Sequence, residues 1–154
     1  QFFIVINSKW TYNFFSTLNA EELYAIMQLR SRVFVVEQNC IYLDADEKDL
    51  HAWHLCCWCN KDLAAYARIL PPGIAFKEAS IGRVVTAPEY RKTGIGRQLM
   101  LRAIEETYKT FETSSIRIGA QLYLKKFYSS LGFMQCSEPY MEDGIPHVEM
   151  LHSL

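Results

Sequence analysis

The hydrophobic positions in the first half of the chain predict strands interrupted by one helix. Runs of apolar and aromatic residues typical of strands occupy 9–15, 52–59 and 63–70. The "NKD" between the last two runs predicts a hairpin. A helix is expected over roughly 20–36, with Asn19 and Glu22 as a capping pair at its start. The residues that follow helical spacing are Leu23, Ile26, Met27, Arg30, Val33 and Phe34.

The second half of the chain alternates strands with helices. Apolar spacing predicts one helix over 94–108 and another from Leu124 to Leu131 that ends at Gly132. The expected strands are 80–87, 115–120, 133–136 and 145–151, with a turn at 142–144. The acidic stretch 38–50 is expected to be a loop. This order predicts a single α+β or α/β domain over residues 1–154, built on a mixed sheet.

Composition limits the classes of partner. Half of the 154 residues are hydrophobic and the net charge is −1, with no block of lysine or arginine. General affinity for nucleic acid or an anionic membrane rests on a basic surface, so neither partner is expected, although a local basic pocket is compatible with this charge. The N-terminal "QFFIVI" is short and lacks a preceding basic region, so we expect no signal peptide. Every apolar run falls short of the ~18 residues that a membrane-spanning helix needs.

The cysteines favour buried thiols over a metal site. There are five, Cys40, Cys56, Cys57, Cys59 and Cys136, and three of them crowd into "LCCWCNK". Structural zinc usually takes two separated pairs of ligands, and this apolar run offers one cluster. We therefore expect reduced thiols on a strand, no metal and a cytoplasmic location.

The stretch "PEYRKTGIGRQLM", residues 88–100, carries the first candidate for binding chemistry. Gly94 and Gly96 lie between a predicted strand and a predicted helix. The start of a helix has unpaired N–H groups and a positive dipole end, and glycine lets an anion approach the backbone closely. Arg91, Lys92 and Arg97 would add positive charge. A tight turn with solvated basic residues is the alternative.

Two familiar phosphate-binding loops do not match this stretch. A P-loop needs Lys followed by Ser or Thr after its second glycine, and Arg97 and Gln98 stand there. A dinucleotide fingerprint needs a third small residue where Leu99 stands. A dinucleotide ligand is therefore not expected.

Two segments together resemble the GNAT N-acetyltransferase superfamily. "RKTGIG" after "VVTAPEY" resembles its acetyl-coenzyme A loop, Arg/Gln-x-x-Gly-x-Gly/Ala, and "LYLKKFYSSLGF" resembles its later helix. Three further segments, "LRSRVFVVEQNCIY", "GAQLYLKKFY" and "EDGIPHVEM", are similar to the ElaA-like branch. The resemblance runs from about residue 20 to near the end. The chain departs from that branch at Ile41, where proline is common, and at Lys92, where glycine is common.

The resemblance implies a fold, a co-substrate and residue roles. The fold would be a mostly antiparallel sheet splayed in its middle, with helices on both faces. The chain would transfer an acetyl group from acetyl-CoA to a primary amine of a small molecule or peptide by direct attack in a ternary complex. Pyrophosphate contacts would come from Arg91, Lys92, Thr93, Gly94, Ile95, Gly96 and Arg97, and pantetheine contacts from Val84, Val85 and Thr86. Tyr128 would protonate the departing thiolate.

The proton-transfer residues have structural alternatives. Tyr128 lies on the apolar face of its helix and can equally be a core residue. Glu37 is a candidate base if it is partly buried with a raised pKa. The alternatives are an ordinary polar residue at the end of the helix, or a salt-bridge partner of Arg32. His54 and His147 are further candidates, as base or substrate contact, although a lone histidine in a strand is usually structural.

Two further features leave function open. Asp44, Asp46, Glu47 and Asp49 form either a solvated loop or a surface that attracts a cationic amine. Their spacing lacks the EF-hand pattern, so calcium is not expected. The aromatics of "KWTYNFF" either mark a homodimer contact or pack in the core. A non-catalytic CoA-binding or protein-interaction module on the same fold is the alternative function.

Overall fold

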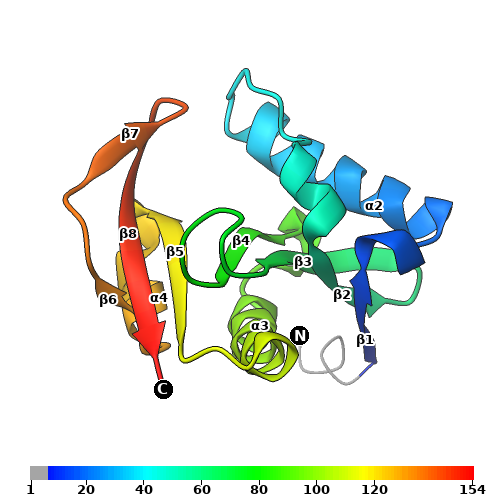
Figure 1. The fold of residues 1–154 in the computed structure, drawn as a ribbon. Coiled ribbons are helices and arrows are strands. Elements are labelled where there is room, and N and C mark those ends of the chain that lie inside the picture. Colours follow the sequence, from blue (N-terminus) through cyan, green and yellow to red (C-terminus); the bar gives the residue numbers. More distant parts are fainter. Residues whose placement is uncertain (1–6) are drawn as a thin grey trace.

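The computed structural model describes residues 7–154, so the expectation about "QFFIVI" falls outside the described residues. The strands (Figure 1) are β1 (Ser8–Phe14), β2 (Trp53–Cys59), β3 (Asp62–Leu70), β4 (Ser80–Thr86), β5 (Ser115–Gln121), β6 (Met134–Gln135), β7 (Tyr140–Glu142) and β8 (Ile145–Ser153). The α-helices are α2 (Ala20–Arg30), α3 (Ile95–Phe111) and α4 (Lys125–Ser129). A π-helix, Ser31–Glu37, continues α2.

The strands form two four-stranded antiparallel sheets that meet at one point. The first has the order β1-β2-β3-β4, and in the second β8 lies between β5 and β6 and also pairs with β7. Among the described residues, a single parallel bridge, Ala79 to Ile116, joins the two sheets, and the Arg117 amide donates to the Ala79 carbonyl at 2.9 Å. Beyond this bridge β4 and β5 diverge (Figure 1), which confirms the predicted sheet that is splayed in its middle.

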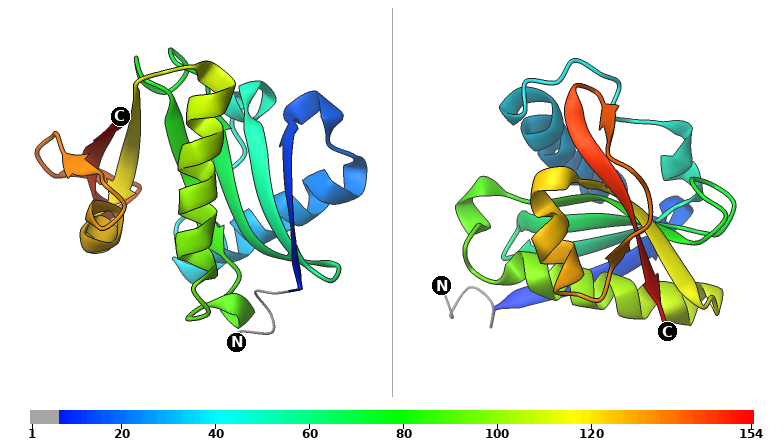
Figure 2. Two further views of the ribbon diagram at one scale, coloured as in Figure 1. Left: turned by 90° about the horizontal axis from the view of Figure 1, so that it is seen from below. Right: turned by 90° about the vertical axis from the view of Figure 1, so that its left-hand side faces the viewer.

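Helices cover both faces of the first sheet, as predicted (Figure 2). On one face Ile26, Leu29 and Val33 of α2 and its π-helical extension pack in a cluster that includes Cys56 and Tyr66. On the other face the larger core contains Leu99, Met100 and Ala103 of α3. Neighbouring residues of β2 point to opposite faces, and this alternation buries Cys56 on the α2 side and Cys57 on the α3 side.

The N-terminal half of the fold follows the predicted elements closely. The helix expected over 20–36 begins at Ala20, where Asn19 and Glu22 make a reciprocal capping box with bonds of 2.8 and 3.0 Å. The hairpin around "NKD" is present as β2 and β3. The helix expected over 94–108 is α3 and runs three residues further than predicted, to Phe111.

The C-terminal half differs more from the predicted elements. The second helix shrinks to five residues, because the chain leaves β5 through a 3₁₀ turn at Leu122–Leu124. Gly132 follows it with a φ of +95°, as expected of a residue that terminates a helix. The strand expected at 133–136 keeps two residues as β6, and β7 was not predicted. β7 has three residues, too few to show a hydrophobic period.

The cysteines of β2 are buried, and aromatic side chains of β1 are partly buried against the core. Cys56, Cys57 and Cys59 are buried in β2, as expected, and burial raises the pKa of the Cys56 and Cys57 thiols to about 12. In β1, Tyr12 stacks on Trp53 with ring centroids 4.9 Å apart, and Trp10 lies under the Arg102 guanidinium. The core-packing interpretation therefore accounts for both aromatics, and the homodimer stays a prediction.

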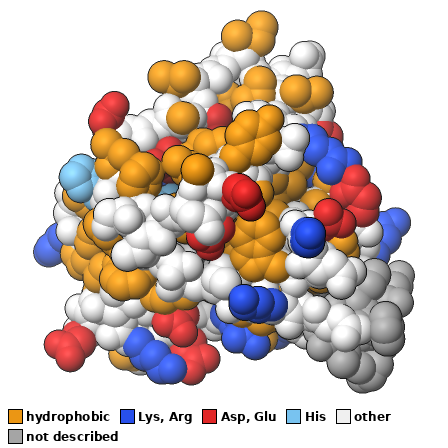
Figure 3. Space-filling model, turned by 90° about the vertical axis from the view of Figure 1, so that its right-hand side faces the viewer, with side chains coloured by type: hydrophobic (Ala, Val, Ile, Leu, Met, Phe, Trp, Pro, Cys, Tyr) orange, Lys and Arg blue, Asp and Glu red, His pale blue; other side chains and the backbone are white. Residues whose placement is uncertain are grey.

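Charged side chains are mixed on the visible surface. On the face in Figure 3, lysine and arginine are interspersed with aspartate and glutamate among apolar side chains. Within residues 7–154 there is no helix long and apolar enough to span a bilayer.

Candidate active site

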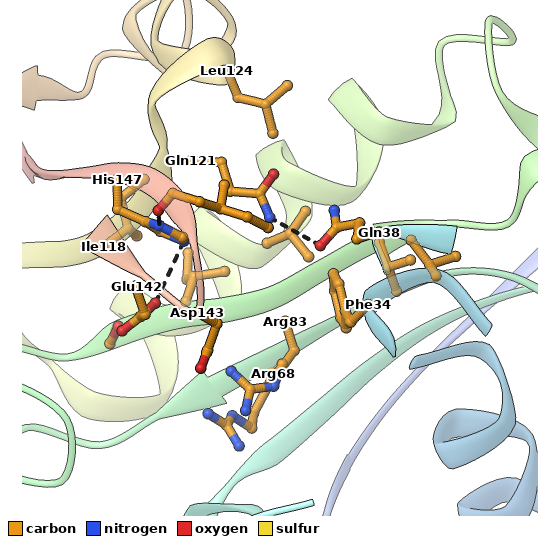
Figure 4. Close-up of a pocket in the computed structure, with 18 of the residues that line it drawn as sticks. Phe34, Gln38, Arg68, Arg83, Ile118, Gln121, Leu124, Glu142, Asp143 and His147 are labelled. Carbon is orange, nitrogen blue, oxygen red and sulfur yellow. Dashed lines mark hydrogen bonds and ion pairs between the residues drawn. The ribbon is translucent and has the colours of Figure 1, made fainter. Parts of the chain in front are cut away.

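A cleft of about 990 Å³ opens where the two sheets separate. β4 and β5 form its floor, the π-helix and the segment after it form one wall, and α4 with the β7–β8 hairpin form the other (Figure 4). Predicted site residues that line it are Val84, Val85, Thr86, Arg91, Gly96, Glu37, Tyr128 and His147. Eight residues predicted from separate segments thus share one cavity.

The floor of the cleft contains a β-bulge. β3 and β4 pair as Tyr66 with Val85 and then as Arg68 with Gly82, so two residues of β4, Arg83 and Val84, oppose one residue of β3. Arg83 has a φ of +50°, a conformation that costs a non-glycine residue about 1–2 kcal/mol. The extra residue of a bulge does not pair in the strand ladder, so β4 keeps unpaired backbone N–H and C=O groups at the cleft.

The loop between β4 and α3 has the form of an anion-binding helix start. Gly94 caps α3 with a φ of +86°, which favours glycine. In the described chain the backbone amides of Gly94, Gly96 and Arg97 have no hydrogen-bond partner. A Cβ on Gly96 would meet Thr86 Oγ1 of β4 at 3.4 Å, an ordinary contact, so a methyl group fits there and a longer side chain would extend toward β4. Unpaired amides at a helix N-terminus fit a pyrophosphate.

The remaining residues of the glycine loop differ in their contacts and backbone conformation. Ile95 buries its side chain in the core, and its amide points to Thr93 Oγ1 at 3.4 Å. Arg97 donates to Ser130 Oγ at 3.1 Å. Lys92 has a φ of +62°, which explains why a related branch can use glycine at this position. Lys92, Thr93, Gly94, Ile95 and Arg97 lie outside the lining of the cleft.

Glu37 is more exposed than predicted. Its side chain is 41% exposed and makes a bidentate ion pair with Arg91, with bonds of 2.7 and 3.1 Å. The expectation of a partly buried carboxylate is therefore wrong, and so is the alternative pairing with Arg32, which binds Glu89 instead. The physical reason is the π-helix, because its last turn carries Glu37 to the rim of the cleft beside the glycine loop.

Tyr128 combines both interpretations of its position. Its ring packs in the core edge-on to Phe127 and Phe133, and the residue is 6% exposed. It also lines the cleft, and within residues 7–154 its hydroxyl has no hydrogen-bond partner. Burial raises the pKa of this phenol well above its ordinary value of 10, so it keeps its proton at all physiological pH values.

His54 is a structural residue, so its prediction as a base or substrate contact is wrong. It is completely buried and lies outside the lining of the cleft. Its Nε2 donates to the Asp49 carbonyl at 3.1 Å, so its Nδ1 accepts from the Tyr66 hydroxyl at 2.6 Å. Burial lowers the pKa of this imidazole. With both nitrogens occupied and no access to the cleft, His54 contacts no substrate.

His147 does reach the cleft. It is 7% exposed, and its Nδ1 donates to the Ile145 carbonyl at 2.7 Å. Its Nε2 lies 3.4 Å from a carboxylate oxygen of Glu142, an ion pair when the imidazole is protonated (Figure 4). The ring also stacks on Tyr140 with centroids 5.9 Å apart.

The acidic stretch is neither a solvated loop nor an open attractor of amines. Asp44 and Asp49 are 7% and 3% exposed. Arg30, completely buried, donates to Asp44 at 2.8 Å and to Asp49 at 2.7 Å, and Arg68 also binds Asp49, at 2.9 Å. Buried arginines thus neutralise these carboxylates and hold the loop against β3. Glu47 alone of the four predicted acidic residues is exposed.

This cluster makes stability depend on pH. Burial opposes ionisation of Asp49, but bonds from Arg30 and Arg68 hold the pKa of its carboxyl below the ordinary value of 3.8. Its stabilising effect is therefore complete above pH 4 and is lost as the pH falls through the lowered pKa. We expect Asp49→Asn to lower the free energy of unfolding by about 1–3 kcal/mol at pH 7, and by less below pH 4. Urea unfolding across pH 3–8 measures the difference, and a constant difference would contradict the ionic contribution.

Several cleft residues were not predicted from the sequence. Arg68 and Arg83 line its floor, and Gln38 and Gln121 meet across it at 3.4 Å (Figure 4). The signal for the arginines was available, because a charged residue inside "LAAYARIL" or "SIGRVV" must be buried with a partner. No comparable signal marks a glutamine at the end of a helix or strand. No cluster of metal-binding type was found among residues 7–154.

Comparisons with known proteins agree with this geometry. A family model described as "Acetyltransferase (GNAT) domain" matches residues 45–154. A UPF0039 protein of Schizosaccharomyces pombe is 46% identical over 146 residues, which cover 94% of this chain and 96% of the relative.

Two solved structures are similar over nearly their whole length. An acyl-CoA N-acyltransferase from Pseudomonas aeruginosa has a TM-score of 0.91 at 38% identity, covering 95% of this chain and 99% of that one. ElaA from Escherichia coli has a TM-score of 0.89 at 40% identity, again covering 95% and 99%. These matches confirm the resemblance to ElaA-like proteins that was inferred from the sequence.

Proposed function

Because the chain belongs to the GNAT acetyltransferase family, we propose that it transfers the acetyl group of acetyl-CoA to a primary amine of a small molecule or peptide. The P. aeruginosa structure, described as an acyl-CoA N-acyltransferase, supports both the donor and the acceptor class. The observation that carries the proposal is the cleft itself, which joins a glycine loop with unpaired amides to a partnerless phenol.

The glycine loop would bind the pyrophosphate of acetyl-CoA. Unpaired amides of Gly94, Gly96 and Arg97 supply donors, and Arg91 and Lys92 supply positive charge. From there the open edge of β4, at Val84, Val85 and Thr86, has polar backbone for the pantetheine amides, since no described strand pairs with it on that side beyond Ala79. The thioester would then lie beside the bulge.

The reaction proposed is direct attack in a ternary complex. A neutral amine attacks the thioester carbonyl, and backbone N–H at the β4 bulge stabilises the oxyanion that forms. The carbon–sulfur bond then breaks, and the Tyr128 hydroxyl gives its proton to the departing thiolate. The amine loses its own proton to a carboxylate of the cleft or to water, and water later returns a proton to Tyr128.

Glu37 has a different role in this proposal from the predicted one. Its carboxylate holds Arg91, which would otherwise be free to bind the diphosphate. We expect Glu37→Gln to tighten acetyl-CoA binding by about two- to fivefold, because an exposed ion pair contributes up to about 1 kcal/mol. Calorimetric titration measures this change, and the reverse sign would contradict it. If Glu37 were instead a general base, Glu37→Gln would lower kcat about 100-fold or more.

Titration of acetyl-CoA into the purified protein, followed by calorimetry, tests the proposal first. One-to-one binding at micromolar concentration, followed by release of free CoA thiol with an amine, would support an acetyltransferase. Binding without turnover on any amine would favour a non-catalytic CoA-binding module. Absence of binding at millimolar acetyl-CoA would overturn the assignment of the glycine loop.

A further inference from the structure

One end of the cleft is cationic. Lys48, Arg68 and Arg83 line it, and Figure 4 shows the two guanidinium groups next to each other. Both reach the carboxylate of Asp46, Arg68 through Nη1 at 2.6 Å and Arg83 through Nη2 at 3.4 Å. The shared carboxylate fixes the two groups close together on neighbouring strands, β3 and β4.

Each guanidinium has donors that the protein does not use. Arg68 donates through Nη1, to Asp46 and Asp49, and Arg83 donates through Nη2, to the Asp44 carbonyl and to Asp46. The Nε of Arg83 also lies 2.9 Å from a carboxylate oxygen of Asp44. Among the described residues, no hydrogen bond or ion pair engages Nη2 of Arg68 or Nη1 of Arg83, and the buried Nε of Arg68 also has no partner. Both arginines line the cleft. The Arg68 side chain is 5% exposed, so its unused donors belong to a largely desolvated group, whereas the Arg83 side chain is 24% exposed. Buried donors normally have acceptors, which points to an acceptor on a ligand.

The local charge balance favours an anionic ligand group. Three arginines of the cluster face three aspartates, namely Arg30, Arg68 and Arg83 against Asp44, Asp46 and Asp49. Lys48 adds a positive charge, and no ion pair of its ammonium occurs within the described part of the chain. A planar carboxylate matches the fork of an arginine, and it would bring the local charge back to zero.

The wall formed by the β7–β8 hairpin is negatively charged. Glu142, Asp143 and Glu149 of the β7–β8 hairpin line it, and the Cys40 thiol holds the turn by donating to the Asp143 carbonyl at 3.3 Å. An amine entering the cleft would face this acidic wall while an attached anion faced the arginines. The cleft therefore fits a molecule that carries both charges.

We propose that the acceptor amine carries a carboxylate within a few bonds of the nitrogen, and that Arg68, Arg83 and Lys48 bind this carboxylate. Free amino acids are the simplest such molecules. The inference rests on the proposed function, because it uses the same cleft and the same thioester position. Arg83 belongs to the β4 bulge, beside which the thioester would lie, and its guanidinium lines the same cleft. This placement suits a carboxylate close to the reacting amine and disfavours one at the far end of a peptide.

The test compares each of the common L-amino acids with its own amide, using acetyl-CoA as donor and release of CoA thiol as the measurement. We expect at least one free acid to be acetylated with a kcat/KM about 10- to 100-fold above that of its amide, mainly through KM. Lys48→Gln should reduce this preference about three- to tenfold without changing the affinity for acetyl-CoA. Lys61→Gln, an exposed lysine in the β2–β3 turn, is the matched control.

The other outcomes distinguish failure of the carboxylate site from failure of the proposed function. Amides that react as well as their acids would overturn the carboxylate site and leave the proposed acetyltransferase intact. Acetyl-CoA binding with no turnover on either series would also overturn it, since the acceptor would then belong to another class. Failure to bind acetyl-CoA would overturn the proposed function itself. Lys48 is used because the arginines also hold the acidic loop, and their loss would affect folding.

Discussion

Replacing Tyr128 with phenylalanine is expected to lower kcat about 100- to 10,000-fold while leaving the affinity for acetyl-CoA unchanged. The hydroxyl has no partner among the described residues, so its removal costs the folded protein little. The proposed reaction loses its proton donor, and general acid catalysis contributes rate factors of this size. Stopped-flow or steady-state release of CoA thiol measures kcat, and calorimetry measures the affinity.

Tyr24→Phe is the matched control, because Tyr24 lies on α2 with 70% of its surface exposed. Its kcat should equal that of the parent protein. If Tyr128→Phe also keeps the parent kcat, Tyr128 is a core residue only and the proton must come from water.

The pH profile gives an independent test of the same residue. Burial raises the pKa of Tyr128 above its ordinary value of 10, so the phenol stays protonated as the pH rises. The rate should therefore increase with pH as the acceptor amine loses its proton, with no decline up to at least pH 9.5. A decline between pH 8 and 9.5 would show that the acid is a different group with a lower pKa.

Gly96→Glu is expected to weaken acetyl-CoA binding more than 100-fold, or about 2.7 kcal/mol. Gly96 lies in the first turn of α3, and its amide has no partner in the described structure. A carboxylate there would face the diphosphate at a short distance inside a partly desolvated cleft, where like charges repel strongly. Calorimetric titration measures the loss.

Two further substitutions at Gly96 separate charge from size. Gly96→Gln has nearly the same shape without the charge, so it should lose much less affinity than Gly96→Glu. Gly96→Ala should bind almost as the parent does, because the new methyl group would meet Thr86 Oγ1 at an ordinary 3.4 Å. Equal affinity of Gly96→Glu and the parent protein would show that the loop is only a turn.

The glycine loop and most of the fold could be predicted because their signals are local. A capping box, a hairpin turn and apolar periods of two or 3.6 residues each lie within one short segment of the chain. The order of strand, glycine loop and helix also predicts an anion site without knowledge of the tertiary structure. For the same reason, the position of Tyr128 at the cleft needed the resemblance, since its helical spacing alone fits a core residue equally well.

The acidic cluster could not be predicted because its partners are distant in sequence. Arg30 meets Asp44 and Asp49 across 14 and 19 positions, through a segment with no hydrophobic period. Seen alone, four acidic residues in a polar segment are typical of a solvated loop. The exposure of Glu37 could not be predicted either, because hydrophobic spacing does not reveal the change from α-helix to π-helix after Arg30. This change shifts every later side chain around the helix axis.

The strand order has a consequence for how the protein is made. β8 is the central partner of the second sheet, yet it follows every other strand in the chain, whereas the first sheet is complete once Thr86 has been synthesised. During translation one wall of the cleft can therefore form well before the other. Until residues 145–153 leave the ribosome, β5 lacks its partner strand in the second sheet, so this interval is when the nascent chain most needs protection from aggregation.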